Sequence, residues 1–411
     1  MPQSTLALEA DQTLQCDGEP LTQQDFLSTL DEIWQSQRLS KVDHAIDHPE
    51  LPFYGGWFVY LGYELAQQIE PSLQLPKNTS HLPDAFATRI PAAVIHDTAL
   101  QKYWLVIEAA FSDEQTKIKE DIQQITEQPF VPAEVELTSI DEDNAGDYLD
   151  GVEKIKRYIV EGDIFQVNLS RAWRAELSAN NTPIDVFAAL TKTNPSPFAA
   201  LVYHEGNYII SSSPERLVQT QQRHVSTRPI AGTRPRNQHE DIDQAYSSEL
   251  LGHPKERAEH IMLIDLERND LGRICEPGSI HVDELMVLES YAHVHHIVSN
   301  VEGQLRADIT PGNVIRAVFP GGTITGCPKV RCMEIIAELE NTARGPYTGS
   351  LGYLNHNGDM DLNILIRTML FDENLSLRAG AGIVADSIPD KELDECRAKA
   401  KGLLLSLGVN I

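Results

Sequence analysis

Two carboxylates on segments far apart in the sequence could together hold a divalent cation. Glu259 lies in the segment 255–260, and Glu395 lies near the C-terminus with Lys399 one helical turn further on. Mg2+ prefers oxygen ligands and keeps positions open for a substrate. The spacing leaves an alternative open, because Glu392, Glu395 and Lys399 could instead form ordinary ion pairs on a helix surface.

Other titratable side chains gather in two extended segments. Glu215 follows directly on an expected strand, where it could serve a site or cap the start of a helix. His293, His295 and His296 lie close together, but side chains alternate between faces in an extended segment. His293 and His295 would then share one face and His296 the other, so we expect no three-histidine zinc site. A single histidine that donates a proton or a hydrogen bond fits the pattern better.

Two glycine-rich stretches could approach a ligand closely. Residues 319–329 place Gly321 and Gly326 at the spacing of a phosphate-binding loop, but Cys-Pro follows where that loop needs Lys and then Ser or Thr. A glycine turn before a helix and a loop that closes over a small anion both stay open. Gly380 and Gly382 lack the third glycine of a dinucleotide fingerprint, so we expect a strand that approaches another backbone or a ligand carboxylate.

The charge of the chain limits its partners. Among 411 residues, 33 are Lys or Arg and 61 are Asp or Glu, which gives a net charge of −28. Nucleic acids and anionic membrane surfaces attract basic proteins, so we expect neither as a partner. An anionic substrate would need a few cationic side chains or a bound metal to attract it locally.

The cysteines and the apolar runs indicate a cytoplasmic protein. The five cysteines, which are Cys16, Cys275, Cys327, Cys332 and Cys396, are scattered and odd in number. This is neither a disulfide framework nor a zinc knuckle, so we expect a reducing compartment. The N-terminal residues do not resemble a signal peptide. The most apolar run, residues 55–63, is much shorter than the ~20 residues of a membrane span.

Hairpins dominate the expected elements after residue 139. The patterns predict one hairpin over residues 198–212 and a second formed by residues 347–354 and 361–371. Helices are expected at residues 144–161, 182–193, 255–271, 330–339 and 391–405, and single strands at 162–170 and 378–385. Because hairpins outnumber β-α-β units, we expect an α+β fold rather than a Rossmann fold.

The first part of the chain has a weaker pattern. Strands are expected at residues 56–62 and 102–109, a solvated helix at 113–127, and a proline-containing linker at 128–134. We therefore expect an N-terminal region, residues 1–135, and a C-terminal region, residues 140–411, that pack as one globular unit.

Eight short motifs occur in order along the C-terminal region. They are Ser-Pro-Glu (213–215), Arg-Pro-Ile-Ala-Gly-Thr-Arg-Pro-Arg (228–236), Lys-Glu-Arg-Ala-Glu-His (255–260), Asp-Leu-Glu-Arg-Asn-Asp-Leu-Gly-Arg (265–273), His-His-Ile-Val-Ser (295–299), Gly-Gly-Thr-Ile-Thr-Gly-Cys-Pro-Lys-Val-Arg (321–331), Gly-Tyr-Leu (352–354) and Ile-Arg-Thr (366–368). This set resembles the chorismate-utilising enzymes: anthranilate synthase component I, aminodeoxychorismate synthase component I, isochorismate synthase and salicylate synthase. The resemblance is dense over residues 140–411 and loose before them.

The resemblance implies a fold and a metal site. The family fold is an α/β sandwich of two large antiparallel sheets with helices packed outside and the active site between the sheets. The family holds Mg2+ between two glutamates that match Glu259 and Glu395. There the metal binds the ring carboxylate of chorismate and draws charge from the departing C4 hydroxyl.

The resemblance also implies roles for single residues. Glu215 matches the general acid/base, and His296 matches a histidine that polarises or protonates near the leaving group. Arg367 and Lys399 match groups that receive the anionic substrate, because an arginine fork suits a carboxylate. Gly382 matches a backbone contact to the same carboxylate. Further matches are Thr233 among the catalytic residues, and Gly232 and Tyr347 among the substrate-binding residues.

Ala231 limits the reactions that the resemblance allows. The water-using members of the family carry lysine at the matching position, and many aminodeoxychorismate synthases use a lysine there as a nucleophile. Alanine can act neither as a base nor as a nucleophile, so the resemblance implies that ammonia itself attacks chorismate at C2. A chorismate-binding relative without activity is not expected, because every matched polar position is intact.

Two aminating activities fit this position. The first is aminodeoxychorismate synthase component I, which makes 4-amino-4-deoxychorismate for para-aminobenzoate and folate through a noncovalent 2-amino intermediate. The alternative is anthranilate synthase component I, which makes anthranilate and pyruvate for tryptophan. Thr-Gly at 325–326 and Val-His-His-Ile at 294–297 differ from the usual anthranilate synthase motifs, so we expect the first. No Cys-His-Glu glutaminase set is apparent, so a separate glutamine amidotransferase subunit is expected to supply ammonia in a heterodimer or larger complex.

Overall fold

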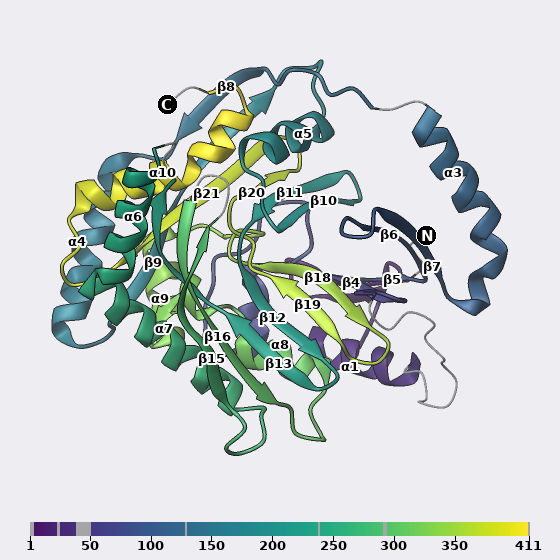
Figure 1. The fold of residues 1–411 in the computed structure, drawn as a ribbon, viewed down its shortest axis with the longest axis horizontal. Helices are drawn as coiled ribbons and strands as arrows, with labels where there is room; N and C mark the ends of the chain where they lie inside the picture. The colour runs from purple at the N-terminus through teal and green to yellow at the C-terminus, as the bar shows by residue number, and fades with distance from the viewer. Residues whose placement is uncertain are drawn as a thin grey trace.

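Two antiparallel β-sheets form the centre of the molecule, and helices cover their outer faces (Figure 1). The computed structural model describes residues 4–22, 25–37, 51–127, 130–236, 239–290 and 294–409. The arrangement is the α/β sandwich that the family resemblance implied, which confirms the expected fold class. In the described part of the chain, no helix is both long and apolar enough to cross a membrane.

The larger sheet has twelve strands drawn from both halves of the sequence. Its order is β14 (Ile230–Pro235), β16 (Val294–Gln304), β13 (His224–Arg228), β12 (Arg216–Gln221), β19 (Met360–Asn363), β18 (Ser350–Asn355), β4 (Gly56–Leu61), β5 (Ala85–Ile90), β1 (Thr5–Leu8), β2 (Leu14–Cys16) and β3 (Glu19–Pro20), with β15 (His281–Ser290) beside β16. Because β4 pairs with β18, strands from residues 1–135 continue the sheet built by residues 140–411. The division into these two regions stays a prediction.

The smaller sheet has seven strands and carries a polar inner face. Its order is β10 (Phe198–His204), β11 (Asn207–Ser213), β20 (Thr368–Phe371), β21 (Leu375–Ile383), β9 (Gln166–Leu177) and β17 (Gly326–Cys327), with β8 (Leu137–Glu142) beside β9. Side chains alternate along a strand. On β9, Val167 and Leu169 pack into the helix-covered core, so Gln166, Asn168 and Ser170 face the other way, into the space between the sheets.

Amphipathic helices cover both outer faces. Four of them, α4 (Ala145–Glu161), α5 (Pro183–Thr193), α9 (Lys329–Glu340) and α10 (Pro389–Ser406), share a core with the smaller sheet. Three others, α1 (Phe26–Gln37), α7 (Pro254–Gly272) and α8 (Pro311–Val318), share a core with the larger sheet. Capping residues fix where two of these helices begin. Thr182 and Asp185 form a capping box at the start of α5, and Asn144 caps the start of α4.

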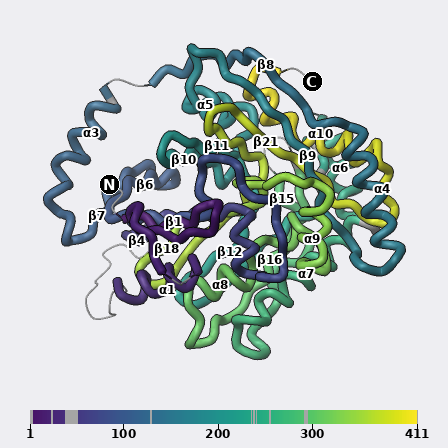
Figure 2. Tube along the Cα trace, turned by 180° about the vertical axis from the view of Figure 1, so that it is seen from behind, coloured from purple at the N-terminus to yellow at the C-terminus, as the bar shows by residue number. Residues whose placement is uncertain are grey.

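The remaining elements are short or peripheral. They are η1 (Tyr63–Leu65), α2 (Ala66–Ile69), η2 (Ala109–Glu114), α6 (Glu240–Gly252), η3 (Gly322–Ile324), α3 (Gln115–Glu127), and the two-stranded sheet of β6 (Ala92–Asp97) and β7 (Lys102–Ile107). Helix α3 lies at the edge of the molecule in both views (Figures 1 and 2). It is the solvated helix that the sequence predicted at residues 113–127.

An apolar cluster joins the two sheets at one end of the sandwich. Tyr60 and Phe86 from the larger sheet pack with Ile209 and Leu370 from the smaller one. Burial of such large side chains is the main favourable contribution to the packing of the two sheets. None of the predicted site residues belongs to this cluster.

Two predictions from the sequence are wrong in their details. The second hairpin is real as β18 and β19, but residues 361–371 do not form one strand. The chain leaves the larger sheet after Asn363 and enters the smaller sheet at Thr368, and Arg367 between them has a φ of +51°. The first part of the chain is also more regular than expected, because α1, β1 and β5 all form there.

Candidate functional site

Two neighbouring chain crossings carry the central side chains of the site. Residues 213–216 pass from β11 to β12, and residues 364–367 pass from β19 back to β20, so each crossing connects the two sheets. The crossings are hydrogen-bonded to each other: the Ile364 N–H donates to the Glu215 carbonyl at 3.0 Å, and the Ser212 N–H donates to the Arg367 carbonyl at 3.0 Å. These hydrogen bonds therefore hold Glu215 and Arg367 close together on two adjoining connections between the sheets.

The Glu215 carboxyl is buried at the first of these connections. Its residue is 4% exposed, and the Ile230 N–H lies 3.5 Å from its Oε1. Burial raises the pKa of Glu215 to about 7, although Thr323, Ile230, Arg367 and Lys399 all act to lower it. A carboxyl with this pKa can take up and release a proton near neutral pH. The helix-capping alternative for Glu215 is wrong, because strand β12 follows it.

Strands β14 and β16 bring the alanine and the histidine to the same place. Ala231 pairs with Ile297, Thr233 pairs with His296, and the register shifts between them at Gly232. Burial lowers the pKa of His296 to about 4, and the nearby positive charge of Arg367 also lowers it. A hydrogen bond with the Gly232 backbone has the opposite, weaker effect on this pKa. The imidazole is therefore neutral at neutral pH and can donate a hydrogen bond from one ring nitrogen.

Gly232 occupies a position that disfavours any residue with a side chain. Its φ is +65°, in the left-handed region, and a Cβ built there would lie 2.3 Å from Glu256 Oε2. Glu256 in turn lies 2.7 Å from the Arg234 guanidinium. A glycine here lets β14 bulge against α7 without displacing this ion pair.

The glycines of β21 make room for polar side chains. A Cβ on Gly382 would lie 2.5 Å from Gln166 Nε2 and 3.7 Å from Glu259 Oε1. A Cβ on Gly380 would lie 2.7 Å from Asn168 Oδ1 and 2.9 Å from the Tyr347 hydroxyl. The backbone carbonyl of Leu169 on β9 would lie 2.6 Å from a Cβ on Gly380, which confirms the expectation that this strand approaches another backbone closely. Side chains from β9 and α7 and Tyr347 approach the strand as well.

Helix α10 reaches the same stretch of β21. Lys399 Nζ donates to the Gly380 carbonyl at 3.1 Å and lies 2.8 Å from Glu395 Oε1. The surface ion pair that the sequence left open is thus present, and both side chains are about half exposed. A carboxylate offers about four lone-pair sites, so this pair leaves Glu395 able to accept a further partner.

The donor set at this stretch fits an oxygen-seeking cation. Glu259 from α7 and Glu395 from α10 both lie beside residues 380–382, and a buried amide oxygen of Gln166 has no hydrogen-bond partner among the described residues. Within the ranges that the structure describes, no three His, Cys, Asp or Glu side chains form a metal cluster. A cation bound here would therefore use two carboxylates and keep positions for water and substrate, as Mg2+ does.

Most predicted residues converge on this site, but not all can be placed. The side chain of Thr233 and the whole of His293 lie outside the described residues. His295 points away, because its Nε2 lies 3.0 Å from Asp243 and its Nδ1 lies 2.8 Å from Ser290. The predicted alternation of His295 and His296 between faces is thereby confirmed.

Sequence reasoning missed two polar residues of the site. Gln166 Nε2 donates to Glu259 Oε1 at 2.9 Å, and Thr323 is the largest influence that opposes the raised pKa of Glu215. A signal for Gln166 existed, since polar residues alternate with Val167 and Leu169 along β9. Thr323 had none beyond its place in the glycine-rich loop.

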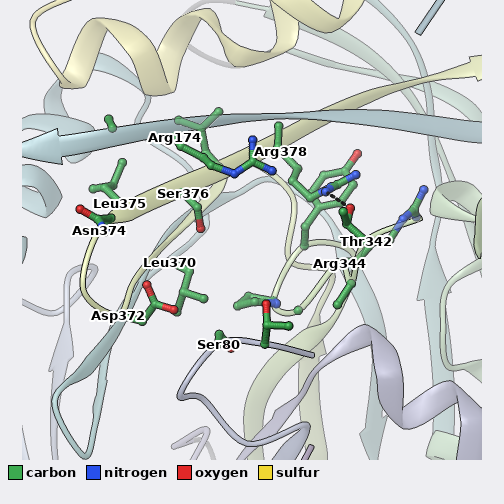
Figure 3. Close-up of a pocket in the computed structure, with 18 of the residues that line it drawn as sticks. Ser80, Arg174, Thr342, Arg344, Leu370, Asp372, Asn374, Leu375, Ser376 and Arg378 are labelled. Carbon is green, nitrogen blue, oxygen red and sulfur yellow. Dashed lines mark hydrogen bonds between the residues drawn. The ribbon is translucent and has the colours of Figure 1, made fainter. Parts of the chain in front are cut away.

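A hollow lies beside the carboxylates of the site, and the predicted substrate-binding residue Tyr347 is among the residues that line it. Its volume is about 430 Å3, and Figure 3 shows Arg174, Arg378 and Ser376 lining it together with Thr342 and Asp372. Ser376 and Arg378 belong to β21, the strand that carries Gly380 and Gly382 further along. Apolar side chains, among them Leu370 and Leu375, line the hollow together with these polar groups. None of the carboxylates Glu215, Glu259 and Glu395 lines it.

Comparison with known proteins decides the family. A family model described as chorismate binding enzyme matches residues 2–405. The chain belongs to this family. It is a chorismate-utilising enzyme, as its motifs and its sandwich fold together indicated.

Relatives of this chorismate-utilising enzyme carry two different activity names. An anthranilate synthase component I-like protein of Synechocystis sp. is 44% identical over 87% of this chain and 73% of its own length. Aminodeoxychorismate synthase component 1 of Bacillus subtilis is 42% identical over 86% and 77%. Anthranilate synthase component 1 of Acetivibrio thermocellus is 40% identical over 87% and 76%.

Solved structures share the fold of this chorismate-utilising enzyme. Anthranilate synthase component I from Streptococcus pneumoniae superposes with a TM-score of 0.85 at 33% identity, over 98% of this chain and 90% of that chain. The menaquinone-specific isochorismate synthase from Escherichia coli superposes with a TM-score of 0.67 at 18% identity, over 99% and 89%. At that identity the second likeness concerns the fold alone.

Proposed function

We propose that the chain is the chorismate-aminating component of an aminodeoxychorismate synthase. It would convert chorismate and ammonia to 4-amino-4-deoxychorismate and water. The observation that carries the amination of chorismate is Ala231, which is buried on β14 next to the Ile230 N–H that faces Glu215. The choice of this product over anthranilate rests on the motifs at 325–326 and 294–297. A methyl group supplies neither a base for water nor a nucleophile for a covalent step, so ammonia must attack the ring directly.

The side chains of the site suit such an attack. Glu215, with its pKa raised to about 7 by burial, would accept a proton from the incoming amine and return it to the leaving hydroxyl. His296 is neutral and would donate a hydrogen bond near the leaving group rather than transfer a proton. Arg367 and Lys399 would bind carboxylates of the substrate, and both already act electrostatically on Glu215.

Mg2+ would be held by Glu259 and Glu395 beside the glycines of β21. When bound, it would act as a Lewis acid and neutralise the negative charge of substrate and protein. The backbone at Gly382 and the Tyr347 hydroxyl over Gly380 would then border the substrate at the same stretch. This arrangement brings an anionic substrate into a chain with a net charge of −28.

Ammonia would come from a separate glutamine amidotransferase subunit. In the described ranges, all five cysteines are free, and Cys275, Cys332 and Cys396 are buried. Burial raises the pKa of the Cys275, Cys332 and Cys396 thiols, which makes each a poor nucleophile. The chain therefore offers no reactive thiolate with which to hydrolyse glutamine among these three residues.

Anthranilate synthase component I is the second candidate. It is favoured by the names of several relatives, and Ala231 fits it equally well. The motifs Thr-Gly at 325–326 and Val-His-His-Ile at 294–297 support the first candidate instead. The two reactions share their first amination at C2 and differ in the fate of the aminated intermediate.

Product analysis separates the two candidates. The chain is incubated with chorismate, MgCl2 and ammonium at high pH, and the products are identified by mass and fluorescence. We expect a non-fluorescent amine that keeps its enolpyruvyl group and gives 4-aminobenzoate and pyruvate when an aminodeoxychorismate lyase is added. Anthranilate as the main product would replace this proposal with the second candidate. A protein adduct of chorismate mass would overturn both noncovalent routes.

A further inference from the structure

We infer that Gln166 is a positioning residue for the cation site, which orients the Glu259 carboxylate and accepts a hydrogen bond from water on the cation. The inference rests on the proposed Mg2+ site and adds a residue that none of the eight motifs contains. It is supported by three features of the structure: the contact with Glu259, the unused amide oxygen, and the backbone that encloses the side chain.

The contact fixes both groups. Gln166 Nε2 donates to Glu259 Oε1 at 2.9 Å, and Gln166 is 5% exposed. An ionised carboxylate only accepts hydrogen bonds, so the amide must present its NH2 group to Glu259 and its oxygen elsewhere. This bond holds the Glu259 oxygen that receives it in place and thereby orients the whole carboxylate.

The oxygen of the same amide, Gln166 Oε1, is buried and accepts no hydrogen bond from the described residues. A buried acceptor without a donor is costly, and most such groups in proteins are paired. Mg2+ usually keeps several waters, and each of these is a hydrogen-bond donor. A cation beside Glu259 would therefore supply the missing donor.

The backbone around Gln166 holds the side chain in this position. The Gln166 carbonyl accepts from Cys332 Sγ at 3.1 Å, and Gln166 pairs with Cys327 of β17. A Cβ on Gly326 would lie 2.1 Å from that carbonyl, and a Cβ on Gly382 would lie 2.5 Å from Nε2. Glycines on two different strands thus enclose Gln166, which gives the end of the glycine-rich loop a role in the site.

A neutral amide suits this task better than a charged donor would. Lysine or arginine at the same place would orient Glu259 equally well but would cancel its charge and repel a cation. Glutamine orients the carboxylate and leaves its charge available. Groups that hydrogen-bond to metal ligands in this way typically change metal affinity 10–100-fold when they are removed.

Calorimetric titration of the full chain with Mg2+, without chorismate, tests the inference. Gln166→Met keeps the size of the side chain and removes both amide functions, and Glu259→Gln removes the ligand itself. Val167→Ala is the matched control, because Val167 neighbours Gln166 but packs into the opposite core. We expect Gln166→Met to weaken Mg2+ binding about 10–100-fold, and Val167→Ala to lower the melting temperature with an unchanged Kd.

Other outcomes are equally informative. A Gln166→Met protein whose Kd is within twofold of wild type would overturn the inference, as would a Glu259→Gln protein that binds like wild type. If Gln166→Met does not fold, Gly382→Ala replaces it, because the added methyl displaces the Gln166 amide and should weaken Mg2+ binding in the same way. Weakened binding together with anthranilate as the product would support the inference and reject only the proposed function.

Discussion

Arg344 Nη2 lies 2.6 Å from Glu340 Oε1, and both side chains are 1% exposed. Arg378 of β21 lies 2.9 Å from the other oxygen of the same carboxylate. Although burial acts to raise it, the two guanidinium groups hold the pKa of Glu340 below its usual value. This one carboxylate joins helix α9, the loop after it and the smaller sheet, and both of its arginine partners line the hollow in Figure 3.

Replacement of Glu340 by glutamine should be strongly destabilising. Glu340→Gln leaves two arginines buried without their counter-charge, and breaking a buried ion pair costs about 3–5 kcal/mol. Urea denaturation followed by circular dichroism measures the loss. Glu338→Gln is the control on the same helix, since Glu338 pairs with Lys154 at the surface and should change stability by less than about 1 kcal/mol. Equal effects of both variants would contradict the buried pair.

The buried carboxyl of Glu215 should make stability depend on pH. Its pKa is raised by burial from 4.5 to about 7, so the folded protein binds a proton there that the unfolded chain has lost. Stability must then fall as pH rises between these values and level off above them. Glu215→Gln removes this dependence, so the variant should gain stability relative to wild type from pH 4.5 to 7. Thermal unfolding at several pH values measures the difference, and a constant difference would refute the raised pKa.

Arg367 should not tolerate lysine. Burial lowers the pKa of Arg367, and a lysine in the same place begins from a lower value and lacks the bidentate fork. A lost charge-assisted hydrogen bond corresponds to about 1.5–3 kcal/mol, so kcat/KM for chorismate should fall about tenfold or more in Arg367→Lys. Arg397→Lys, at an exposed pair with Glu142, should leave the kinetics unchanged. Normal kinetics in Arg367→Lys would show that the arginine is structural.

Gly232 should be sensitive to the smallest side chain. Alanine at a φ of +65° costs about 1–2 kcal/mol, and its methyl group would also collide with Glu256. The bulge between the Ala231–Ile297 and Thr233–His296 pairs should shift, so Gly232→Ala should lose both stability and turnover. Gly272→Ala provides the control, because a Cβ there meets nothing within 4 Å. Similar melting temperatures and rates for the two variants would show that β14 does not need glycine at this bulge.

Glu395 should behave as a metal ligand rather than only as the partner of Lys399. Glu395→Gln keeps the shape of the side chain but removes an anionic ligand, so the Mg2+ concentration for half-maximal activity should rise at least about tenfold. Asp394→Asn removes a charge from the neighbouring position on α10 and should have little effect. An unchanged Mg2+ requirement in Glu395→Gln would reduce its role to the surface ion pair.

Local patterns predicted most of the helices and the first hairpin. Thr182 and Asn144 are caps whose effect depends only on neighbouring residues, and α5 and α4 begin beside them as expected. The strands of the first part of the chain were missed because their partners are distant: β5, for example, pairs with β1 across most of that region. Pairing between distant segments leaves no local signal.

The candidate site, too, was predicted from the sequence only in part. Glu215 and Arg367 were predicted from motifs, and the structure places them on adjoining crossings. The break before Thr368 was not predicted, because residues 361–371 have the alternation of one strand and the change of sheet depends on tertiary packing. Gln166 was missed because its role appears only when Glu259 of α7 comes to lie beside β9.

The paired crossings also determine when the enzyme can become active during folding. Glu215 and Arg367 are far apart in the sequence, and each lies between a strand of one sheet and a strand of the other. Neither residue has its final neighbours until the two sheets have docked, which is a long-range event and slow compared with helix and hairpin formation. Regained activity is therefore a measure of completed docking, and partly folded chains with normal secondary structure cannot contribute to it.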